Sequence, residues 1–305
     1  MVAGGWRLTV GAAMLVTSAV VVPAAQADTG CEWIATELAF PAGVHPGGLL
    51  VGDGDWMAST SRRSTAVVWH DEVPMTVNFP VERAVYDISP TGVLLSVGSD
   101  GVWRGEERLE PLPGRQTWST NWMNTGGDVL GRSDGALAVW PAGSASPTLV
   151  EDTDDGRAWW PKGIDDAGNV IGNVDGEAYV WNREGDRTRL QPLPGHDKAY
   201  SEFVFDGRVF GRSHSPDGDY GTSVEWNLRG EVVRTLPGGA VMAANHAGDL
   251  LMFGDPWPGG QGTAVLRANG RVDPLILNVF PDVITESGDV FGGRYFDRPL
   301  KLACA

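Results

Sequence analysis

Lysine is scarce in this sequence. Only three lysines occur, Lys162, Lys198 and Lys301, and the formal net charge is −16 at pH 7 over 305 residues. A surface with such an excess of acidic residues repels phosphate backbones and anionic lipid headgroups. We therefore expect no nucleic-acid partner and no attraction to anionic membranes.

Long apolar runs are absent beyond the N-terminus. The one run, Leu8 to Val22, spans about 15 residues, whereas a membrane-crossing helix needs roughly 20. It follows a single basic residue, Arg7, and precedes Ala25-Gln26-Ala27, whose small residues suit a signal peptidase. We interpret residues 1–27 as a secretory signal peptide and 28–305 as a single extracellular domain without membrane insertion.

Cysteine is equally rare, with only Cys31 and Cys304, close to the two ends of the chain. In an oxidising compartment, two isolated cysteines most simply form a disulfide with each other. This pairing requires the ends of the domain to lie side by side. A lipid anchor on Cys31 is the alternative, but that signal needs an apolar residue three positions earlier, where the chain has Asp28.

No segment has the periodicity of an amphipathic helix, whereas 42 glycines and 20 prolines indicate short strands joined by turns. A short apolar segment that begins and ends with glycine recurs along the chain, at intervals of 35 to 44 residues. The leading glycines of the seven copies are Gly48, Gly92, Gly127, Gly168, Gly207, Gly248 and Gly288. The chain is therefore built from seven units of about forty residues.

Each unit contains four short strands. An apolar strand precedes the glycine turn, the glycine-flanked strand follows, a third strand ends in tryptophan, and a fourth ends near Pro-Gly, as in LQPLPG at 190–195. The tryptophans of the third strand are Trp69, Trp103, Trp140, Trp181 and Trp226. Four strands in units of this length are typical of propeller blades. We predict an all-β fold, a seven-bladed β-propeller.

The seventh unit is incomplete, because the chain stops after a candidate third strand at 300–304. The segment TELAFPAG at 36–43 matches the fourth-strand pattern. We expect this N-terminal strand to complete the last blade, which would remove an open sheet edge and bring Cys31 beside Cys304. The repeat and the cysteines thus predict the same closure independently.

The best-preserved unit combines IDDAGNVIG at 164–172, AYVW at 178–181 and LQPLPG at 190–195. It resembles the HAF repeat of bacterial extracellular proteins, whose units pair an I-N-x-x-G-x-V-x-G segment with an aromatic-ended strand. The usual His-Ala-Phe triplet is replaced here by Ala-Tyr-Val at 178–180 and similar triplets. The resemblance covers nearly all of residues 28–305 and implies an exported propeller, but it transfers no catalytic residues.

The acidic residues of this unit have structural explanations. Asp165 and Asp166 fall in a turn that is polar in most units, and Asp175-Gly176 is a preferred hairpin pair. The acidic segments at 53–55, 152–156 and 217–219 do not satisfy the pattern of a calcium loop. We predict no cofactor and no metal site, with a calcium ion in an acidic loop as the alternative.

No nucleophile motif of the G-x-S-x-G type and no close histidine pair occurs, so the catalytic residues are unknown. Aromatic residues, in contrast, concentrate in the connections from fourth to first and from second to third strands, which open on one face of a propeller. The second-to-third connection is longest at 53–66, 212–223 and 255–264. The candidate ligand-binding residues are Trp56, Trp118, Trp159, Trp160, Tyr200 and Trp257.

An aromatic rim of this kind can bind sugar rings, peptides or a partner protein, whereas the alternative is that the tryptophans only pack between blades. Trp159 and Trp160 are adjacent, and neighbouring strand residues face opposite ways, so at most one should be buried in the same gap.

We hypothesise a noncatalytic scaffold that binds an extracellular glycan, peptide or protein. The alternative is an extracellular hydrolase or lyase with a site assembled from several blades at the channel mouth. Convergence of three or more of eight polar residues in one pocket would favour catalysis, and scattered positions would favour binding. The eight are Arg62, Asp154, Asp155, Lys162, His196, Asp197, His214 and Asp217.

Overall fold

The computed structural model describes residues 31–304 with short gaps, at 43, 45, 54, 62–63, 153–157, 218–220, 255–261, 276–278 and 295–297. Only the backbone is described at 46–50, 53, 117, 118, 121, 294 and 298. The chain divides into two units, and all described residues belong to the second, Cys31–Ala305. The predicted signal peptide, 1–27, lies outside the described residues.

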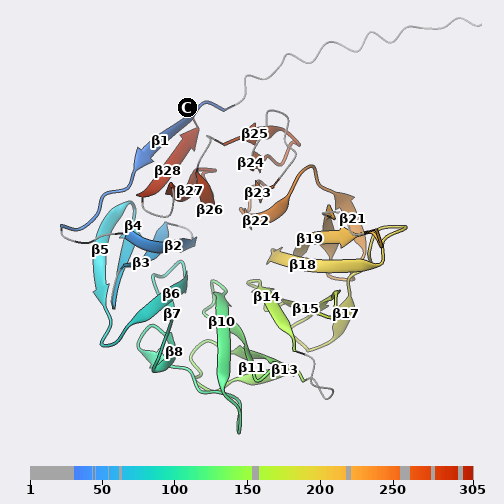
Figure 1. Ribbon diagram of the computed structural model, residues 1–305, viewed down its shortest axis with the longest axis horizontal. Coiled ribbons are helices and arrows are strands. Elements are labelled where there is room, and N and C mark those ends of the chain that lie inside the picture. The colour runs from blue at the N-terminus through green and yellow to red at the C-terminus, as the bar shows by residue number, and fades with distance from the viewer. Residues whose placement is uncertain are drawn as a thin grey trace, which may run out of the picture. The chain divides into compact units, whose positions relative to one another are not determined.

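The described part of the chain forms seven antiparallel four-stranded sheets, arranged as blades around a central opening (Figure 1). It contains no helix long and apolar enough to cross a membrane. The seven-bladed β-propeller predicted from the repeat is confirmed.

Blades are numbered here in chain order, and within each blade the strands follow one another from the centre outward. The first strands are β2 (Pro46–Asp53), β6 (Arg83–Ile88), β10 (Thr117–Met123), β14 (Trp160–Ile164), β18 (Lys198–Phe205), β22 (Ala240–Ala244) and β26 (Phe280–Ile284). The second strands are β3 (Trp56–Ser61), β7 (Leu94–Gly98), β11 (Val129–Ser133), β15 (Val170–Val174), β19 (Arg208–His214), β23 (Leu250–Phe253) and β27 (Val290–Arg294). The third strands are β4 (Thr65–His70), β8 (Gly101–Arg104), β12 (Ala136–Trp140), β16 (Glu177–Trp181), β20 (Thr222–Asn227), β24 (Thr263–Leu266) and β28 (Arg298–Cys304). The fourth strands are β5 (Val73–Asn78), β9 (Glu107–Arg108), β13 (Thr148–Glu151), β17 (Arg187–Arg189), β21 (Val232–Thr235), β25 (Val272–Pro274) and, in blade 7, β1 (Trp33–Glu37).

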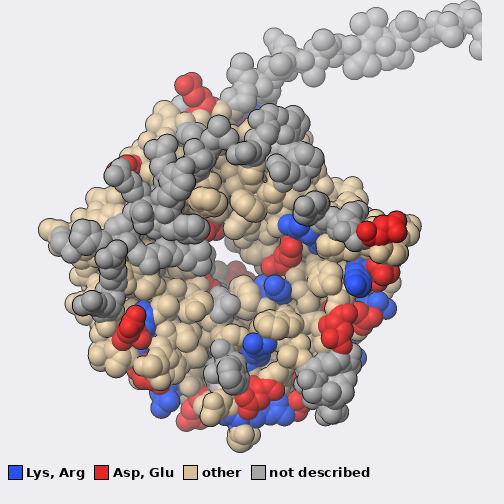
Figure 2. All heavy atoms as spheres, in the orientation of Figure 1, with Lys and Arg blue, Asp and Glu red and all other residues tan. Residues whose placement is uncertain are grey.

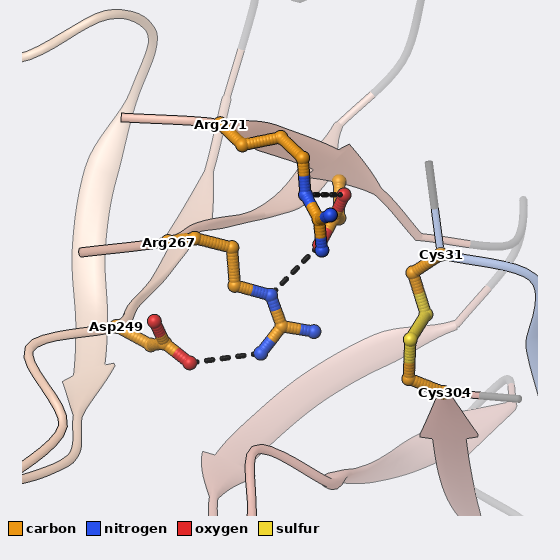
Figure 3. The surroundings of a disulfide bond; sticks show 6 residues. Cys31, Asp249, Arg267, Arg271 and Cys304 are labelled. Atoms are coloured by element: carbon orange, nitrogen blue, oxygen red, sulfur yellow. Dashed lines mark hydrogen bonds and ion pairs between the residues drawn. A yellow bond between two sulfur atoms is a disulfide. The ribbon is translucent and has the colours of Figure 1, made fainter. Parts of the chain in front are cut away.

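Blade 7 joins the two ends of the described chain. Strand β1 pairs antiparallel with β28, from Trp33 opposite Cys304 to Glu37 opposite Leu300. It begins a few residues before the segment 36–43 in which a fourth strand was expected. The predicted disulfide between Cys31 and Cys304 is confirmed, with Cα atoms 5.4 Å apart (Figure 3).

Four of the five third-strand tryptophans belong to the core, as expected for a repeated structural residue, whereas Trp103 is only partly buried. Trp69, Trp140, Trp181 and Trp226 are fully buried. The Trp140 ring nitrogen donates a hydrogen bond of 2.6 Å to the carbonyl oxygen of Glu110 at the end of blade 2. The Trp226 ring nitrogen likewise donates a hydrogen bond of 2.7 Å to the carbonyl oxygen of Gln191. Each ring therefore fills the gap to the preceding blade and also fastens the two blades together.

The acidic turn of blade 4 has the structural role predicted for it. The Asp165 side chain is buried and accepts hydrogen bonds from the backbone N–H of Asn169 over 2.8 Å and of Gly207 over 3.1 Å. Gly168 in the same turn has φ +83°, which a residue with a Cβ rarely adopts. Asp165 thus shapes its own turn and holds the corresponding turn of blade 5.

The register predicted for the first unit was wrong. Gly48 belongs to the first strand β2, and Trp56–Ser61, which was expected in a long loop, forms the second strand β3. Asp53 pairs with Trp56, so residues 54–55 alone connect the two strands. The sequence GDWM at 54–57 is the true counterpart of GDVL at 127–130, and the tryptophan in place of valine obscured the match.

Candidate functional site

The adjacent tryptophans before blade 4 have opposite environments. Trp159 is 4 % exposed and makes edge-to-face contacts with Trp181 and Tyr179, at centroid distances of 4.9 and 5.5 Å. Trp160, the first residue of β14, is 55 % exposed, and the Arg132 guanidinium lies 4.2 Å from its ring centroid. The prediction that at most one of the pair is buried in the same gap is confirmed, and Trp159 belongs to the core.

The remaining aromatic candidates do not form one cluster among the described residues. The Trp56 ring stacks on His70 at 4.1 Å and lies against Gly92, where an added Cβ would come within 2.8 Å of it. Trp118 lies in β10 with only its backbone described, and Trp257 lies outside the described residues. Tyr200, in contrast, lines a pocket together with charged residues.

This pocket lies between blades 4 and 5 and has a volume of about 440 Å³. We call it the blade 4–5 pocket. It is lined by Lys162, Asn173, Asp197, Lys198, Tyr200, Ser201, Glu202, Arg212, His214, Ser215 and Pro216.

Three of the eight polar residues named above converge in the blade 4–5 pocket: Lys162, Asp197 and His214. His196 and Asp217 do not line it, and Arg62, Asp154 and Asp155 lie outside the described residues. Three converging residues meet the criterion that was set above as favouring catalysis.

Two of the lining residues, Lys162 and Glu202, occupy β-bulges of their first strands. In β14, Pro161 and Gly163 pair with consecutive residues of β15, which leaves Lys162 without a partner in the ladder. In β18, the same irregularity between Ser201 and Phe203 leaves Glu202 unpaired. A bulge changes the direction of the extra side chain, and it is a common feature beside binding sites.

The pairing of β18 with β19 positions four more residues. Lys198 lies opposite His214, and Tyr200 lies opposite Arg212. The Tyr200 and His214 rings meet edge to face at a centroid distance of 5.1 Å. The Tyr200 hydroxyl lies over Gly176, where an added Cβ would come within 3.0 Å of it. The pocket therefore needs the glycine of the blade 4 hairpin.

A hydrogen-bonded contact fixes the distance between the two blades. The Asn173 side chain accepts from the backbone N–H of Ser201 over 2.9 Å and from its hydroxyl over 2.8 Å, and it donates to the Ser201 carbonyl oxygen over 2.9 Å. Both residues are buried. The two walls of the pocket are thus held in a fixed relative position.

Glu202 has an unusual electrostatic environment. Its Oε1 lies 3.2 Å from Nε of Arg212, while the buried Oε2 has no hydrogen-bond partner among the described residues. Burial raises the pKa of the Glu202 carboxyl above its usual range, although Arg212, Lys162 and His214 act in the opposite direction. The pocket therefore combines a carboxyl whose pKa is raised by burial with several basic groups.

A second pocket, between blades 1 and 2, shows what the fold itself requires at this position. Its volume is about 350 Å³, and its lining includes Ala84, Val97 and Ser99, at the repeat positions of Tyr200, Arg212 and His214. Arg83 there pairs with Asp100 over 2.7 Å and covers the Trp103 ring at 3.9 Å. Glu82 and Arg83 also line the blade 1–2 pocket, but at the three positions compared small residues suffice, so packing does not demand Tyr200, Arg212 and His214.

Sequence reasoning missed Glu202, Arg212, Lys198 and Asn173. The signal was present in the repeat, because the position of Arg212 is occupied elsewhere by Val97, Arg132, Asn173, Phe253 and Gly293. A position without a common residue type is free of a shared structural role.

The described residues contain no group of three or more His, Cys, Asp or Glu that could hold a metal ion.

The sequence matches no family model and no curated protein. Its fold is similar to several solved propellers. Virginiamycin B lyase from Staphylococcus aureus is 14 % identical, with 90 % of this chain and 100 % of that chain covered and a TM-score of 0.59. An oligogalacturonate lyase in complex with manganese is 11 % identical, with 90 % and 98 % covered and a TM-score of 0.61. The extracellular domain of the putative one-component system BT4673 from B. thetaiotaomicron is 11 % identical, with 87 % and 39 % covered and a TM-score of 0.55. At these identities the similarity shows the fold alone.

Proposed function

We propose that the protein is an exported β-propeller that binds a carboxylate-bearing ligand in the blade 4–5 pocket. One observation carries the proposal: two of the three lysines in a chain of net charge −16, Lys162 and Lys198, line this single pocket. Arg212 and His214 add further basic groups. Asp197 and Glu202 are the acidic residues of the lining, so Lys162, Lys198 and Arg212 leave the pocket with an excess of positive charge, which on an acidic protein attracts an anion.

The side chains suit a carboxylate in particular. The planar Arg212 guanidinium is a group suited to carboxylates, as its pairing with Glu202 over 3.2 Å illustrates, and Lys162 adds a point charge from the opposite blade. Uptake of a proton by Glu202 removes the negative charge that opposes the ligand. The Tyr200 ring can pack on an apolar face of the bound molecule.

Export is proposed on three grounds: the signal-peptide pattern at 1–27, the Cys31–Cys304 disulfide, and the resemblance of the repeat to that of bacterial extracellular proteins. The ligand is then an extracellular molecule, such as an acidic glycan.

The test is calorimetric titration of oligogalacturonate into the wild type and into Lys162→Ala and Arg212→Gln. Each variant removes a hydrogen bond to a charged group, so we expect affinity to fall about tenfold or more. Arg229→Gln is the matched control, because Arg229 is an exposed arginine on the outer part of blade 5, 80 % exposed at its side chain. Unchanged affinity in both pocket variants would exclude this site.

A second candidate function is elimination from the same carboxylate-bearing ligand. It is favoured by the position of Glu202, whose pKa is raised by burial, beside the basic groups Lys162 and His214 in one pocket. In such a lyase, Arg212 would neutralise the substrate carboxylate, a basic group would remove the proton on the adjacent carbon, and protonated Glu202 would protonate the leaving oxygen. Two of the similar propellers are lyases by name.

The two functions differ in a simple assay. Elimination creates a carbon–carbon double bond conjugated to the carboxylate, which is seen as a rise in ultraviolet absorbance. Glu202→Gln should abolish that rise while oligogalacturonate still binds. Binding without any rise, and without new reducing ends from hydrolysis, would identify a noncatalytic binding protein.

A further inference from the structure

Trp160 is an exposed aromatic residue on a firmly held backbone. It follows the buried Trp159, whose N–H donates to the Gly135 carbonyl oxygen over 3.0 Å, and it precedes Pro161. Proline fixes its own φ and restricts the residue before it to extended conformations. More than half of the Trp160 surface is nevertheless exposed. A flat ring held in this way loses little freedom when a ligand packs on it.

The Arg132 guanidinium of blade 3 lies over the Trp160 ring, 4.2 Å from its centroid. The buried Nε of Arg132 has no hydrogen-bond partner among the described residues, and none of their carboxylates forms an ion pair with it. A cation–π contact holds the cation beside the ring without neutralising its charge. The pair therefore combines an exposed ring with a positive charge.

This pair lies next to the blade 4–5 pocket. Trp160 pairs in the ladder with Asn173, which lines the pocket and accepts a hydrogen bond from Ser201 of blade 5. The Cα atoms of residues paired in antiparallel strands are about 4.5–5.5 Å apart. Lys162, two residues further along β14, also lines the pocket. Trp160 therefore stands beside the wall that blade 4 contributes to the pocket.

The gap between blades 3 and 4 repeats the arrangement of the gap between blades 4 and 5. In each gap the following blade carries an aromatic residue at one repeat position, Trp160 or Tyr200. The second strand of the preceding blade supplies a side chain that contacts the following blade, Arg132 or Asn173. Elsewhere the aromatic position is occupied by Ala84, Ser119, Ala240 and Phe280 in blades 2, 3, 6 and 7. Among blades 2 to 7, blades 4 and 5 are the neighbours that both carry an aromatic residue there.

The two gaps lie on opposite sides of blade 4. Neighbouring sheets pack about 10 Å apart, so a ligand that reaches both gaps is longer than a single sugar ring. Basic and acidic side chains are visible beside the central opening, on the side of β14 and β18 (Figure 2). A linear polymer repeats its rings and charges at regular intervals, as the two gaps repeat theirs.

We propose that the ligand is an acidic oligosaccharide that spans blade 4, with the carboxylate of one sugar in the blade 4–5 pocket and a neighbouring sugar stacked on Trp160. A sugar ring suits an exposed aromatic ring, because its C–H face packs on the aromatic surface while its hydroxyl groups stay in water. An apolar peptide side chain would instead need an enclosing pocket. Arg132 is then a positioning residue, which orients the Trp160 ring and attracts the second carboxylate. This inference rests on the proposed function, since it assigns the first carboxylate to the same pocket.

The experiment compares galacturonate with trigalacturonate by calorimetric titration, and by NMR where binding is weak. We expect trigalacturonate to bind the wild type about tenfold more tightly, because the trimer alone reaches both gaps. Trp160→Ala should remove most of this gain, and Trp160→Phe, which keeps an aromatic ring, should retain part of it. Arg132→Gln should reduce the gain several-fold, and Arg132→Lys should restore part of it because lysine keeps the charge. Leu149→Ala, on the outermost strand of blade 3 and 46 % exposed, is the matched control and should keep the full gain.

The outcomes separate this inference from the proposed function. Equal affinities for the two saccharides, with both lost in Arg212→Gln, overturn the extended ligand and leave the carboxylate site standing. A gain that survives Trp160→Ala overturns the second sugar position. Triglutamate, which carries carboxylates without a sugar ring, should bind more weakly than trigalacturonate, and equal affinity would overturn the oligosaccharide in favour of an acidic peptide. If neither Lys162→Ala nor Arg212→Gln changes the affinity for trigalacturonate, both proposals fail.

Discussion

The Asn173 side chain of blade 4 forms hydrogen bonds with both backbone groups of Ser201 in blade 5. It accepts from the Ser201 N–H and donates to the Ser201 carbonyl oxygen, both over 2.9 Å. The contact is buried, so each of its polar groups depends on the other.

Asn173→Ala should therefore cost stability and ligand affinity together. It leaves the Ser201 N–H and carbonyl buried without partners, at a cost of about 1–3 kcal/mol for each unsatisfied group. Urea unfolding and ligand titration check the two effects. Asn182→Ala is the control, because Asn182 makes its hydrogen bonds in an exposed turn, and equal losses in both variants would contradict the role of Asn173.

Trp159→Ala and Trp160→Ala should differ strongly in stability. Trp159 packs on Trp181 and Tyr179 in the core, so its removal creates a cavity and should cost about 3–5 kcal/mol. Trp160 is more than half exposed and loses only its contact with Arg132, a cost of less than about 1 kcal/mol. The prediction is checked by measuring the free energy of unfolding of the two variants. Similar losses in both would contradict the buried environment of Trp159 and the exposed environment of Trp160.

Asp273→Ala should destabilise the protein strongly. Asp273 is fully buried and accepts from Arg267 over 2.7 Å and from Arg271 over 2.9 Å. Removing one member of a buried ion pair typically costs about 3–5 kcal/mol, but Arg267 keeps its ion pair with Asp249 over 2.8 Å, so we expect a loss of about 2–3 kcal/mol. Denaturant unfolding measures the loss, with Glu231→Ala as an exposed control that loses only its surface pair with Arg229.

The same site predicts a loss of stability in acid. Burial alone would raise the pKa of Asp273, but the hydrogen bonds from Arg267 and Arg271 outweigh it and hold the pKa below the usual value of 3.8. The contribution of Asp273 is therefore complete above pH 3.8 and is lost as the pH falls through the lower value in the folded state. Asp273→Asn should weaken the acid dependence of the unfolding free energy, and an unchanged dependence would exclude this carboxylate as its source.

Ligand binding should strengthen as the pH falls. The raised pKa of Glu202 means that this carboxyl is protonated at a higher pH than an ordinary glutamate, and protonation removes the charge that opposes an anionic ligand. Lys162, Lys198 and Arg212 supply the positive charge of the pocket. Glu202→Gln should bind the carboxylate ligand more tightly at neutral pH and with a flatter pH profile. A full pH dependence in this variant would exclude Glu202 as its source.

Cys31→Ser/Cys304→Ser should lower the unfolding free energy by about 2–5 kcal/mol, because the disulfide restricts the unfolded chain over 273 residues. Mass spectrometry of the wild type without reductant should show a deficit of two hydrogens. The single variant Cys304→Ser is the control, since it should be as unstable as the double variant. Free thiols in the wild type would contradict the bond.

The sequence by itself determined the architecture, because a propeller is specified locally and many times over. The glycine turn, the tryptophan of the third strand and the closing turn recur in unit after unit, so one irregular unit, such as the first with Trp56 in place of valine, shifts a register without changing the fold. The two cysteines predicted their own pairing because no other partner exists for either.

Only the tertiary structure decided where the chemistry lies. Lys162, Asn173, Glu202 and Arg212 come from four different strands and meet because neighbouring blades face each other. Glu202 is an ordinary acidic residue in the sequence, and its raised pKa arises from burial against blade 4. Repetition makes strands and blades readable from residue patterns, whereas a site between blades depends on where those patterns are broken and on which broken positions come together in space.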